Sequence, residues 1–362
     1  MLAVGDICSA LGRFLRFEDL KALSSLNSQL VAVSLARVQL FTRSAFRVPT
    51  FMSDGDLELF LSRISPNVIP LIKTLRVESS FRFESRLIIG GADAGGRTND
   101  RRQMLSMKTT RAQRVWGFFP HVEVLDLTDD LSATLDSVGQ LTKLQSLDMS
   151  ANISLNLAPL VECHSLKHLF LNESNVSNES LAHIKSLTLL ETLEIRNCRF
   201  VSDISCLAGL MNLRRLVIGG NAIKDFSVLS QFTNLRHFQH ASASRKSWPK
   251  MDFPLRAPEL EYCDVAGTPV RDVDFLLFSP RLAHLNISWT TLAAAPPLAH
   301  FKHLKVLIVS SPLPRDLECY APLETLCELE RIEFHKIGNA SLEPPVVEAK
   351  FPACVRHLLV FP

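Results

Sequence analysis

The sequence lacks the features of a metalloprotein, an exported protein or a membrane protein. Its eight cysteines include no CxxC pair and no Cys/His group at the spacing of zinc ligands. No stretch approaches the ~20 apolar residues that cross a bilayer, and no basic start precedes an apolar run at the beginning of the chain. We therefore expect reduced thiols, no metal or other cofactor, and an intracellular location in the cytoplasm or nucleus, with organelle import left open.

The charge balance lacks a dominant sign. Lysine and arginine total 39 against 37 aspartate and glutamate residues, which gives a net charge of +2 in 362 residues. Such a balance provides no whole-chain attraction to nucleic acid or to an anionic membrane. The hydrophobic fraction of 47% is ample for a continuous core, so the chain is expected to fold.

What the sequence does contain is one phrase, LxxLxLxxN, repeated eleven times. The repeats begin at Val122, Leu144, Leu166, Leu190, Leu213, Leu235, Leu260, Leu282, Leu304, Leu329 and Val355. Their first, fourth and sixth positions are apolar except at His240, and the ninth is often a small polar residue (Asn152, Ser174, Asn221, Thr268). Successive starts lie 22 to 26 residues apart, within the ~20 to 29 residues of leucine-rich repeats.

Two periods inside each repeat predict its shape. The LxL segment alternates as a short strand does, with its apolar side inward, and the return segment steps by three, as in Ile204, Leu207 and Leu210. One coil cannot bury its leucines alone, so coils must stack. The expected fold class is α/β: a leucine-rich repeat solenoid with a parallel β-sheet on its concave face, short helices or 3₁₀ segments on its convex face, and an N-terminal α-helical segment.

The repeats resemble the 22-residue repeats of phosphatase-regulatory and internalin-type proteins, as in the stretch FVSDISCLAGLMNLRRLVIGGNAIKDFSVLSQFTNL. The resemblance covers roughly residues 121–340. It implies the solenoid fold and is almost silent on function. His240 stands in an otherwise apolar column, so we expect a buried core histidine followed by an irregular loop. The segment 72–77 (IKTLRV) predicts an early, isolated strand of the same array.

Residues 4–30 place apolar side chains at helical spacings and predict two or three short helices. The run resembles an F-box, and this resemblance implies that Leu11, Leu15, Leu20 and Leu23 bind a Skp-type adaptor. The alternative interpretation is a helical cap that seals the first coil of the solenoid.

The domains expected from these patterns are three. Residues 1–48 form the F-box-like helical segment or cap, and residues 49–120 form irregular first repeats with a basic, glycine-rich insertion at 86–114. Residues 121–362 form the leucine-rich repeat domain.

The third, fifth and seventh positions of each repeat face the concave side if the first, fourth and sixth face inward. Position five carries five acids and no base along the array, which disfavours a nucleic acid laid along the concavity. No two adjacent repeats carry histidine at position three, which argues against a zinc site. No short nucleophile–base motif predicts catalysis, so we expect a protein that is not an enzyme.

The concave residues that remain are aromatic, aliphatic and of mixed charge, as in protein–protein interfaces. The candidate protein-binding residues are Phe170, Glu194, Arg215, His237, Tyr262, Asp264 and His284. Small residues at position seven, such as Gly219, Ala241 and Ala266, would let a partner approach closely. Because histidine has a reference pKa of about 6.5, the two candidate histidines predict binding that varies between about pH 5.5 and 7.5.

The sequence thus predicts a protein–protein interaction module that holds a partner protein on its concave face, as a monomer within a hetero-complex and away from membranes. The F-box resemblance implies the substrate-recognition subunit of a cullin-type ubiquitin ligase. The alternative is a leucine-rich repeat scaffold, a phosphatase-regulatory-type subunit or a component of a large assembly, in which the N-terminal helices only cap the repeats.

Overall fold

The protein is described here by a computed structural model that covers residues 46–49, 74–78, 118–128, 135, 138–152, 155–241, 253–292, 297–311, 323, 325–336 and 354–361, the first two stretches by their backbone alone. The chain divides into two compact units, Met1–Val176 and Ser177–Pro362. The adaptor-binding candidates Leu11, Leu15, Leu20 and Leu23 and the basic insertion at 86–114 lie outside the described residues.

The unit Met1–Val176 contains parallel strands that follow one another in chain order. They are β1 (Phe46–Pro49), β2 (Thr74–Glu78), β3 (Val124–Asp126), β4 (Ser146–Asp148) and β5 (His168–Phe170), with 3₁₀ segments η5 (Val138–Gln140) and η6 (Ala158–Glu162) on the return paths. The pairing is in register, with Leu125 opposite Leu147 and Leu147 opposite Leu169. Strand β2 confirms the early strand expected at 72–77. Strand β1 crosses the boundary between the first two expected domains, where the sequence predicted no strand.

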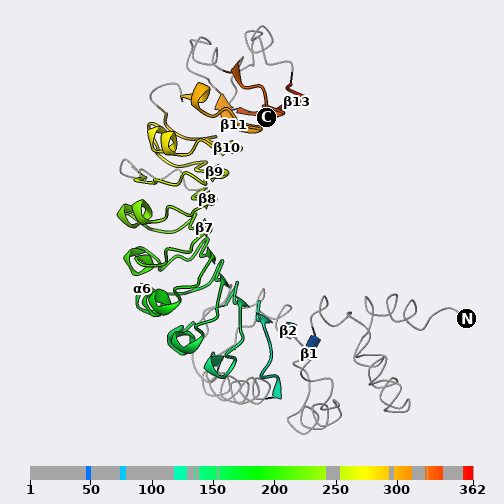
Figure 1. Ribbon diagram of the computed structural model, residues 1–362, viewed down its shortest axis with the longest axis vertical. Coiled ribbons are helices and arrows are strands. Elements are labelled where there is room, and N and C mark those ends of the chain that lie inside the picture. The colour runs from blue at the N-terminus through cyan, green and yellow to red at the C-terminus, as the bar shows by residue number, and fades with distance from the viewer. Residues whose placement is uncertain are drawn as a thin grey trace, which may run out of the picture. The chain divides into compact units, whose positions relative to one another are not determined.

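The unit Ser177–Pro362 repeats the same coil. After α6 (Asn178–Leu181) and η7 (Ala182–Ser186) come strands β6 (Thr192–Glu194), β7 (Arg215–Val217), β8 (His237–Gln239), β9 (Tyr262–Asp264), β10 (His284–Asn286), β11 (Val306–Ser311), β12 (Arg331–Lys336) and β13 (His357–Phe361). Segments η8 (Ser205–Leu207), η9 (Ser227–Gln231), η10 (Asp274–Phe278) and η11 (Leu298–His300) lie between them. Within this unit the strands line the inner side and the 3₁₀ segments the outer side (Figure 1).

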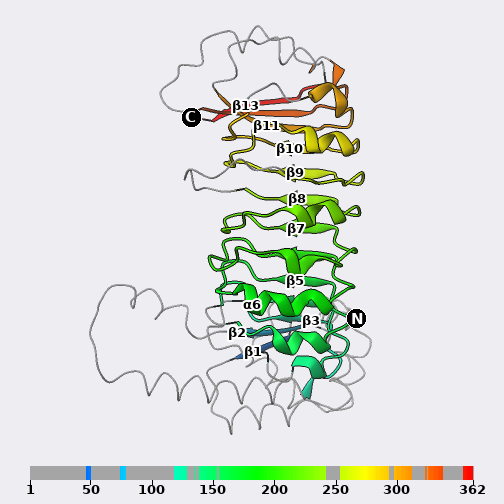
Figure 2. The same ribbon diagram turned by 90° about the vertical axis from the view of Figure 1, so that its left-hand side faces the viewer.

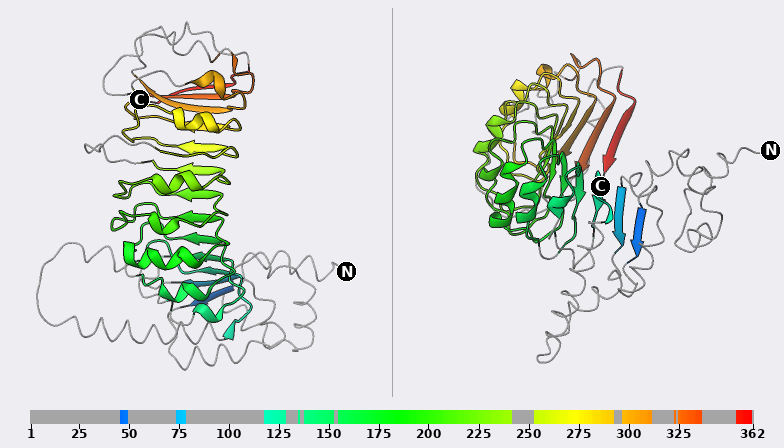
Figure 3. Two further views of the ribbon diagram at one scale, coloured as in Figure 1. Left: turned by 60° about the vertical axis from the view of Figure 1, so that its left-hand side comes forward. Right: turned by 60° about the horizontal axis from the view of Figure 1, so that its bottom comes forward.

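Each strand of Ser177–Pro362 is parallel to the next, and the repeats stay in register along the chain. The stack of strands is visible from the side in Figure 2, and their common direction in Figure 3. Strands β6 to β10 have three residues each, whereas β11 and β12 have six. The later coils therefore differ from the earlier ones, in the part of the chain where the sequence loses its polar ninth position.

The repeated leucines form the core, as predicted. In the coil of β7, Leu213, Leu216 and Ile218 are fully buried, and so are Leu207 and Leu210 of the return segment before it. Burying each such side chain contributes roughly 1.5–3 kcal/mol. His240 is also fully buried, as expected for a core histidine. Strand register and buried columns together make the chain a leucine-rich repeat solenoid.

After β4, β5, β6, β7, β9 and β10 the backbone turns through a left-handed residue at position eight, which the sequence did not predict. The residues concerned are Ala151, Glu173, Asn197, Gly220, Gly267 and Trp289, with φ between 57° and 76°. A side chain in this conformation costs about 1–2 kcal/mol. Regular hydrogen bonds offset the cost: Asn197 N–H donates to the Gly219 carbonyl at 2.8 Å, and Gly267 N–H to the Ser288 carbonyl at 2.8 Å.

The polar residue at position nine closes the turn that follows the strand. Asn221 Nδ2 donates to the Ile218 carbonyl (3.1 Å) and to the Ile195 carbonyl of the preceding coil (2.7 Å), while its Oδ1 accepts Cys198 N–H (2.7 Å). Asn152 makes the equivalent carbonyl contacts, at 2.8 Å and 3.0 Å. These buried side chains satisfy backbone groups that neither strand nor return segment can pair.

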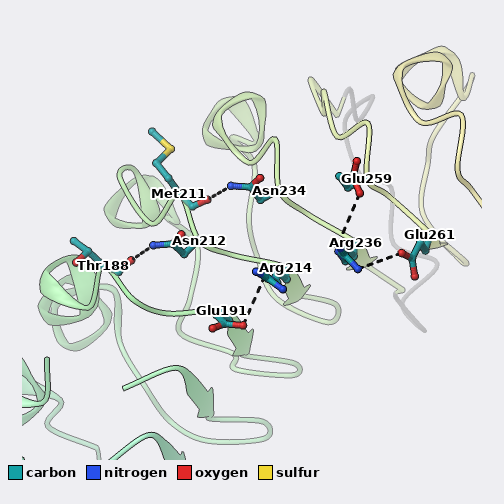
Figure 4. A network of polar contacts seen from close by, with 9 residues as sticks. All are labelled: Thr188, Glu191, Met211, Asn212, Arg214, Asn234, Arg236, Glu259 and Glu261. Atoms are coloured by element: carbon teal, nitrogen blue, oxygen red, sulfur yellow. Dashed lines mark hydrogen bonds and ion pairs between the residues drawn. The ribbon is translucent and has the colours of Figure 1, made fainter. Parts of the chain in front are cut away.

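A second set of asparagines ties the coils at the surface. Asn212 and Asn234 each precede the first leucine of a repeat, in the phrases NLRRL and NLRHF. Asn212 Nδ2 donates to the Thr188 carbonyl and Asn234 Nδ2 to the Met211 carbonyl, both at 2.9 Å (Figure 4). Both bonds join one coil to the preceding coil, and both are exposed to solvent.

The two kinds of asparagine provide a matched test. Asn221→Ala removes the buried hydrogen-bond partner of three backbone groups, and leaving each group unpaired costs about 1–3 kcal/mol. We therefore expect the free energy of unfolding to fall by about 3 kcal/mol or more. Asn212→Ala removes one exposed bond and should cost about 1 kcal/mol or less. Urea unfolding of both variants measures the difference. Equal losses would contradict the role given to position nine.

Candidate protein-binding face

The strand face of Ser177–Pro362 carries most of the residues predicted to bind a partner. Glu194 ends β6, Arg215 begins β7, and His237, Tyr262 and His284 begin β8, β9 and β10. Phe170, at the end of β5, belongs to the other unit, where it lies opposite Asp148 and is half-buried. The site described below is therefore built from β6 to β10 alone.

The rings of His237, Tyr262 and His284 form one continuous stack across three strands. The imidazole of His237 lies 4.0 Å from the phenol ring of Tyr262, centroid to centroid, with 7° between the planes. Tyr262 lies 4.3 Å from His284 with 12° between the planes. The register that pairs His237 with Tyr262 and Tyr262 with His284 brings these rings side by side. We call this group the aromatic ladder.

The sequence placed these three residues in one column without predicting that they stack. Because both faces of the Tyr262 ring are covered by imidazoles, a partner meets mainly the edges of the rings. Those edges carry the phenol oxygen and the imidazole nitrogens, which donate and accept hydrogen bonds. His237 Nε2 is buried and has no hydrogen-bond partner among the described residues.

Burial changes the protonation of the ladder. It lowers the pKa of His237 to about 4, an effect that the neighbouring charge of Arg215 reinforces. Burial likewise lowers the pKa of His284 and raises that of Tyr262 to about 12. All three rings are uncharged at neutral pH. The titration of His237 therefore lies below the window of pH 5.5 to 7.5 that the reference value predicts, and that of His284 is moved in the same direction.

An ion pair borders the ladder. Arg215 Nε donates to Glu194 Oε1 at 2.7 Å, and the side chains of arginine and glutamate are 38% and 16% exposed. Arg215 is also the register partner of His237. The bond to Glu194 restrains the guanidinium in the strand next to the first ring of the ladder.

Asp264 is engaged in the fold. The residue is buried. Its Oδ1 accepts the Ala266 N–H at 3.0 Å, and its Oδ2 accepts a hydrogen bond from Gln239 Nε2 at 3.3 Å. Burial raises the pKa of this carboxyl, although the bond from Ala266 and the charge of Arg196 lower it. Asp148 and Asn286 likewise accept, through Oδ1, the backbone N–H of the residue two positions later in the chain. Position five thus favours Asp and Asn because they stabilise the end of the strand.

Gly219 is small for a reason other than access by a partner. A Cβ built on it would lie 2.2 Å from the carbonyl oxygen of Ala241 in the next coil. Only glycine lets these two backbones approach so closely. Val217 beside it is 2% exposed, although its position faces the strand side. The neighbouring coil thus takes up space that the sequence assigned to a partner.

The described residues contain no metal-binding cluster, and three of their cysteines are held as protonated thiols. No group of three or more His, Cys, Asp or Glu side chains in this part of the chain could hold a metal ion. Burial raises the pKa of Cys163 and of Cys206 to about 11, and that of Cys263 further, so these thiols stay protonated at neutral pH. In the same part of the chain, no helix has both the length and the apolar character of a membrane span.

His240 lies beneath this face, in the core of the coil of β8. Its Nδ1 is 3.3 Å from the Ile218 carbonyl, its Nε2 has no hydrogen-bond partner among the described residues, and the rings of Phe226 and Phe253 pack edge-on at 5.0 and 5.6 Å. This apolar enclosure lowers the pKa of His240 to about 4. Protonation of the imidazole would place an uncompensated charge in the core.

No protein-family model matches the chain. A protein of Trypanosoma equiperdum named "Putative adenylate cyclase regulatory protein" is 27% identical over 146 residues, which are 36% of this chain and 22% of that relative. This chain therefore matches only about a fifth of the relative's length.

Several solved structures of repeat proteins are similar. The internalin InlF of Listeria monocytogenes has 14% identity and a TM-score of 0.38, with 67% of this chain and 81% of that chain covered. The functional domain of InlJ from the same bacterium has 13% identity and a TM-score of 0.45, covering 67% and 59%. An Arabidopsis thaliana receptor ectodomain, GASSHO1/SCHENGEN3 in complex with Casparian strip integrity factor 2, has 16% identity and a TM-score of 0.43, covering 62% and 28%. These scores are low, so the fold assignment rests on the register and the buried columns.

His240 should make stability depend on pH. An unfolded histidine titrates near pH 6.5 and the buried one near pH 4, so the stabilisation is complete above pH 6.5 and is lost as the pH falls toward 4. The loss amounts to about 3 kcal/mol. His240→Leu lacks this titration, so its free energy of unfolding should fall less than that of the parent protein between pH 7 and pH 4, by about 3 kcal/mol. Urea unfolding at both pH values measures the difference. The exposed His164→Gln is the control, and parallel profiles for the parent and His240→Leu would contradict the prediction.

Proposed function

We propose that this protein is a non-enzymatic protein-binding module whose partner lies on the strand face of Ser177–Pro362. The aromatic ladder carries the proposal, because a rigid row of rings next to a fixed guanidinium loses little conformational entropy when a partner binds. Aromatic residues and arginine supply most of the binding energy in protein interfaces. Glu194, Arg215, His237, Tyr262 and His284 form the proposed contact. Asp264 stabilises the end of β9 through its bonds from Ala266 and Gln239, and Phe170 is a separate candidate on the other unit.

Tyr262 should be the most sensitive position of this contact. Tyr262→Ala removes the middle ring of the ladder and the surface that holds both imidazoles in place. Truncation of a central aromatic side chain typically costs about 2 kcal/mol or more, so partner recovery should fall about thirtyfold. Arg215→Ala should weaken binding in the same direction. The measurement is affinity purification of the full chain from cells, with quantification of the co-purifying proteins.

The control is Phe278→Ala, which removes a side chain that is 53% exposed on η10, away from the strands. This variant should retain full partner recovery. The assignment of the strand face fails if Tyr262→Ala and Arg215→Ala bind normally while Phe278→Ala does not.

We further propose, from the F-box resemblance of residues 1–48, that the partner on the strand face is a target of ubiquitination. In this role the N-terminal helices dock a Skp-type adaptor of a cullin ligase. The second candidate is a regulatory or scaffold subunit with the helices as a cap, and the name of the trypanosome relative favours it. The two functions differ in the class of protein that co-purifies: an adaptor and cullin in one case, an enzyme under regulation in the other.

Charge substitutions in the N-terminal segment separate these two functions. Leu11→Asp combined with Leu15→Asp should abolish recovery of an adaptor, because burying an unpaired carboxylate in an apolar contact is unfavourable. Recovery of the strand-face partner should stay unchanged. The readout is the ratio of adaptor to target in one purification. Absence of any adaptor from the parent sample, or loss of repeat folding in the variant, would favour the capping function.

A further inference from the structure

Two histidines at β8 each bury a ring nitrogen that has no partner. Four buried side-chain nitrogen or oxygen atoms lack a hydrogen-bond partner among the described residues, and two of them are the Nε2 atoms of His237 and His240. His237 begins β8 and belongs to the aromatic ladder, whereas His240 directly follows β8 and lies in the core. Because buried polar atoms are seldom left unpaired, two of them at one strand require an explanation.

Only the neutral form of these imidazoles fits its surroundings. Nδ1 of His240 lies 3.3 Å from the Ile218 carbonyl, so Nδ1 carries the proton and Nε2 is bare. Protonation would add an N–H at Nε2, in the enclosure formed by Phe226 and Phe253, where no described residue accepts it. His237 would gain an N–H at a buried nitrogen in the same way. A buried donor without an acceptor is unfavourable, and a buried charge more so.

Both histidines pack against the coil of β9. His237 is stacked on Tyr262, which begins β9, and His240 packs edge-on against Phe253, in the return segment before β9. We call the contact between the coil of β8 and the coil of β9 the β8–β9 joint. Ring contacts of a histidine thus cross this joint on the strand face and in the core.

The outer side of the β8–β9 joint differs from that of the neighbouring joints. The coils that lead to β7, β8, β10 and β11 contain η8, η9, η10 and η11. In the coil that leads to β9, the described residues 253–261 form no helical segment. Each coil of a solenoid contacts only its neighbours, so one joint can open while the others stay closed.

We infer that the β8–β9 joint opens under acid: when His237 and His240 take up protons, the coil of β8 separates from the coil of β9 while the coils on either side stay folded. Opening brings both Nε2 atoms into contact with water. The bond from His240 to the Ile218 carbonyl belongs to the preceding coil and persists. The ring contacts with Tyr262 and Phe253 are lost.

The groups around His237 oppose its protonation in the closed joint. Burial is the largest cause that lowers the pKa of His237 to about 4. The charges of Arg215 on β7 and His284 on β10 act in the same direction, whereas Glu194 on β6 and the Gln239 side chain raise the pKa. The balance keeps His237 neutral while the joint is closed.

The sign of the pH effect follows from the core histidine. Burial lowers the pKa of His240 to about 4, and an exposed histidine titrates near pH 6.5. The closed joint is therefore fully stable above about pH 6.5 and weakens as the pH falls toward 4. Asp264 on β9 acts the other way, because burial raises the pKa of its carboxyl and acid favours the buried, protonated form. It offsets part of the effect of the histidines.

Hydrogen exchange of the full chain, corrected for the intrinsic rate at each pH, measures the opening. Amides 261–262 bond the Arg236 carbonyl across the β8–β9 joint, and amides 305–306 bond the Ala283 carbonyl in the coil of β10. His240 alone should raise the opening constant about 50-fold between pH 7 and about pH 4.5. We expect amides 261–262 to lose protection at least about tenfold while amides 305–306 keep theirs. Equal losses at both sets, or none at 261–262, would overturn the inference.

Matched variants assign the opening to the two histidines. His237→Phe with His240→Leu keeps a ring on the strand face and an apolar side chain in the core, so amides 261–262 should stay protected at about pH 4.5. His237→Phe with His240→Met serves if the leucine variant fails to fold. The control His303→Gln changes an exposed histidine bonded to Glu328 and should open like the parent protein. Opening of a folded double variant as in the parent protein would overturn the inference.

One consequence rests on the proposed function. Opening separates His237 from Tyr262, so a partner bound to the aromatic ladder should be released at about pH 4.5 and bind again at pH 7. The exchange experiment needs no partner, which keeps the two hypotheses apart. An open joint with the partner still bound would support the inference and contradict the ladder as the contact surface. A joint that stays closed overturns the inference, whatever the partner does.

Discussion

The polar side chain at position nine is the constraint on which the rest of this structure depends. A coil must leave its strand after a few residues, and the turn leaves buried backbone groups that leucine cannot pair. Asn221 bonds its own coil at Ile218 and the preceding coil at Ile195 and Cys198, so one amide both closes a turn and fixes the distance to its neighbour. That fixed distance lets the left-handed residue at position eight reach the carbonyl of the next coil, as Asn197 does with Gly219. It also requires glycine at 219, because the Ala241 carbonyl occupies the place of a side chain.

The same spacing determines what the strand face presents to a partner. Adjacent strands lie about 4.8 Å apart, and rings that begin successive strands in register need only a small tilt to reach the 4.0 and 4.3 Å seen in the aromatic ladder. The stack therefore follows from the solenoid once three ring-bearing residues occupy one column. Its consequence is chemical: close packing takes water away from His237 and His284, which lowers the pKa of both imidazoles and keeps them neutral.

Much of the fold could be predicted because its signal repeats. The leucine columns, the strand positions, the buried His240 and the polar ninth position all follow from the spacing LxxLxLxxN. The left-handed position eight could not, because Glu173, Asn197 and Trp289 carry no common preference, and the conformation is imposed by bonds to the next coil. On the strand face, the sequence identified the column of His237, Tyr262 and His284. It could not distinguish side chains that face a partner from those used internally, such as Asp264 and Val217, since that depends on how closely neighbouring coils approach.

The chemistry of the aromatic ladder decides what a contact with it would depend on. The ladder is uncharged at neutral pH and offers ring edges, so a contact there would gain its free energy from hydrogen bonds and from the exclusion of water, and salt would affect it little. Arg215 differs, because it is already bonded to Glu194: a carboxylate of a partner would have to compete with that glutamate, and its Coulomb contribution would fall with ionic strength. A partner confined to the ladder would therefore keep nearly all of its affinity in salt, whereas one that also binds Arg215 would lose part of it.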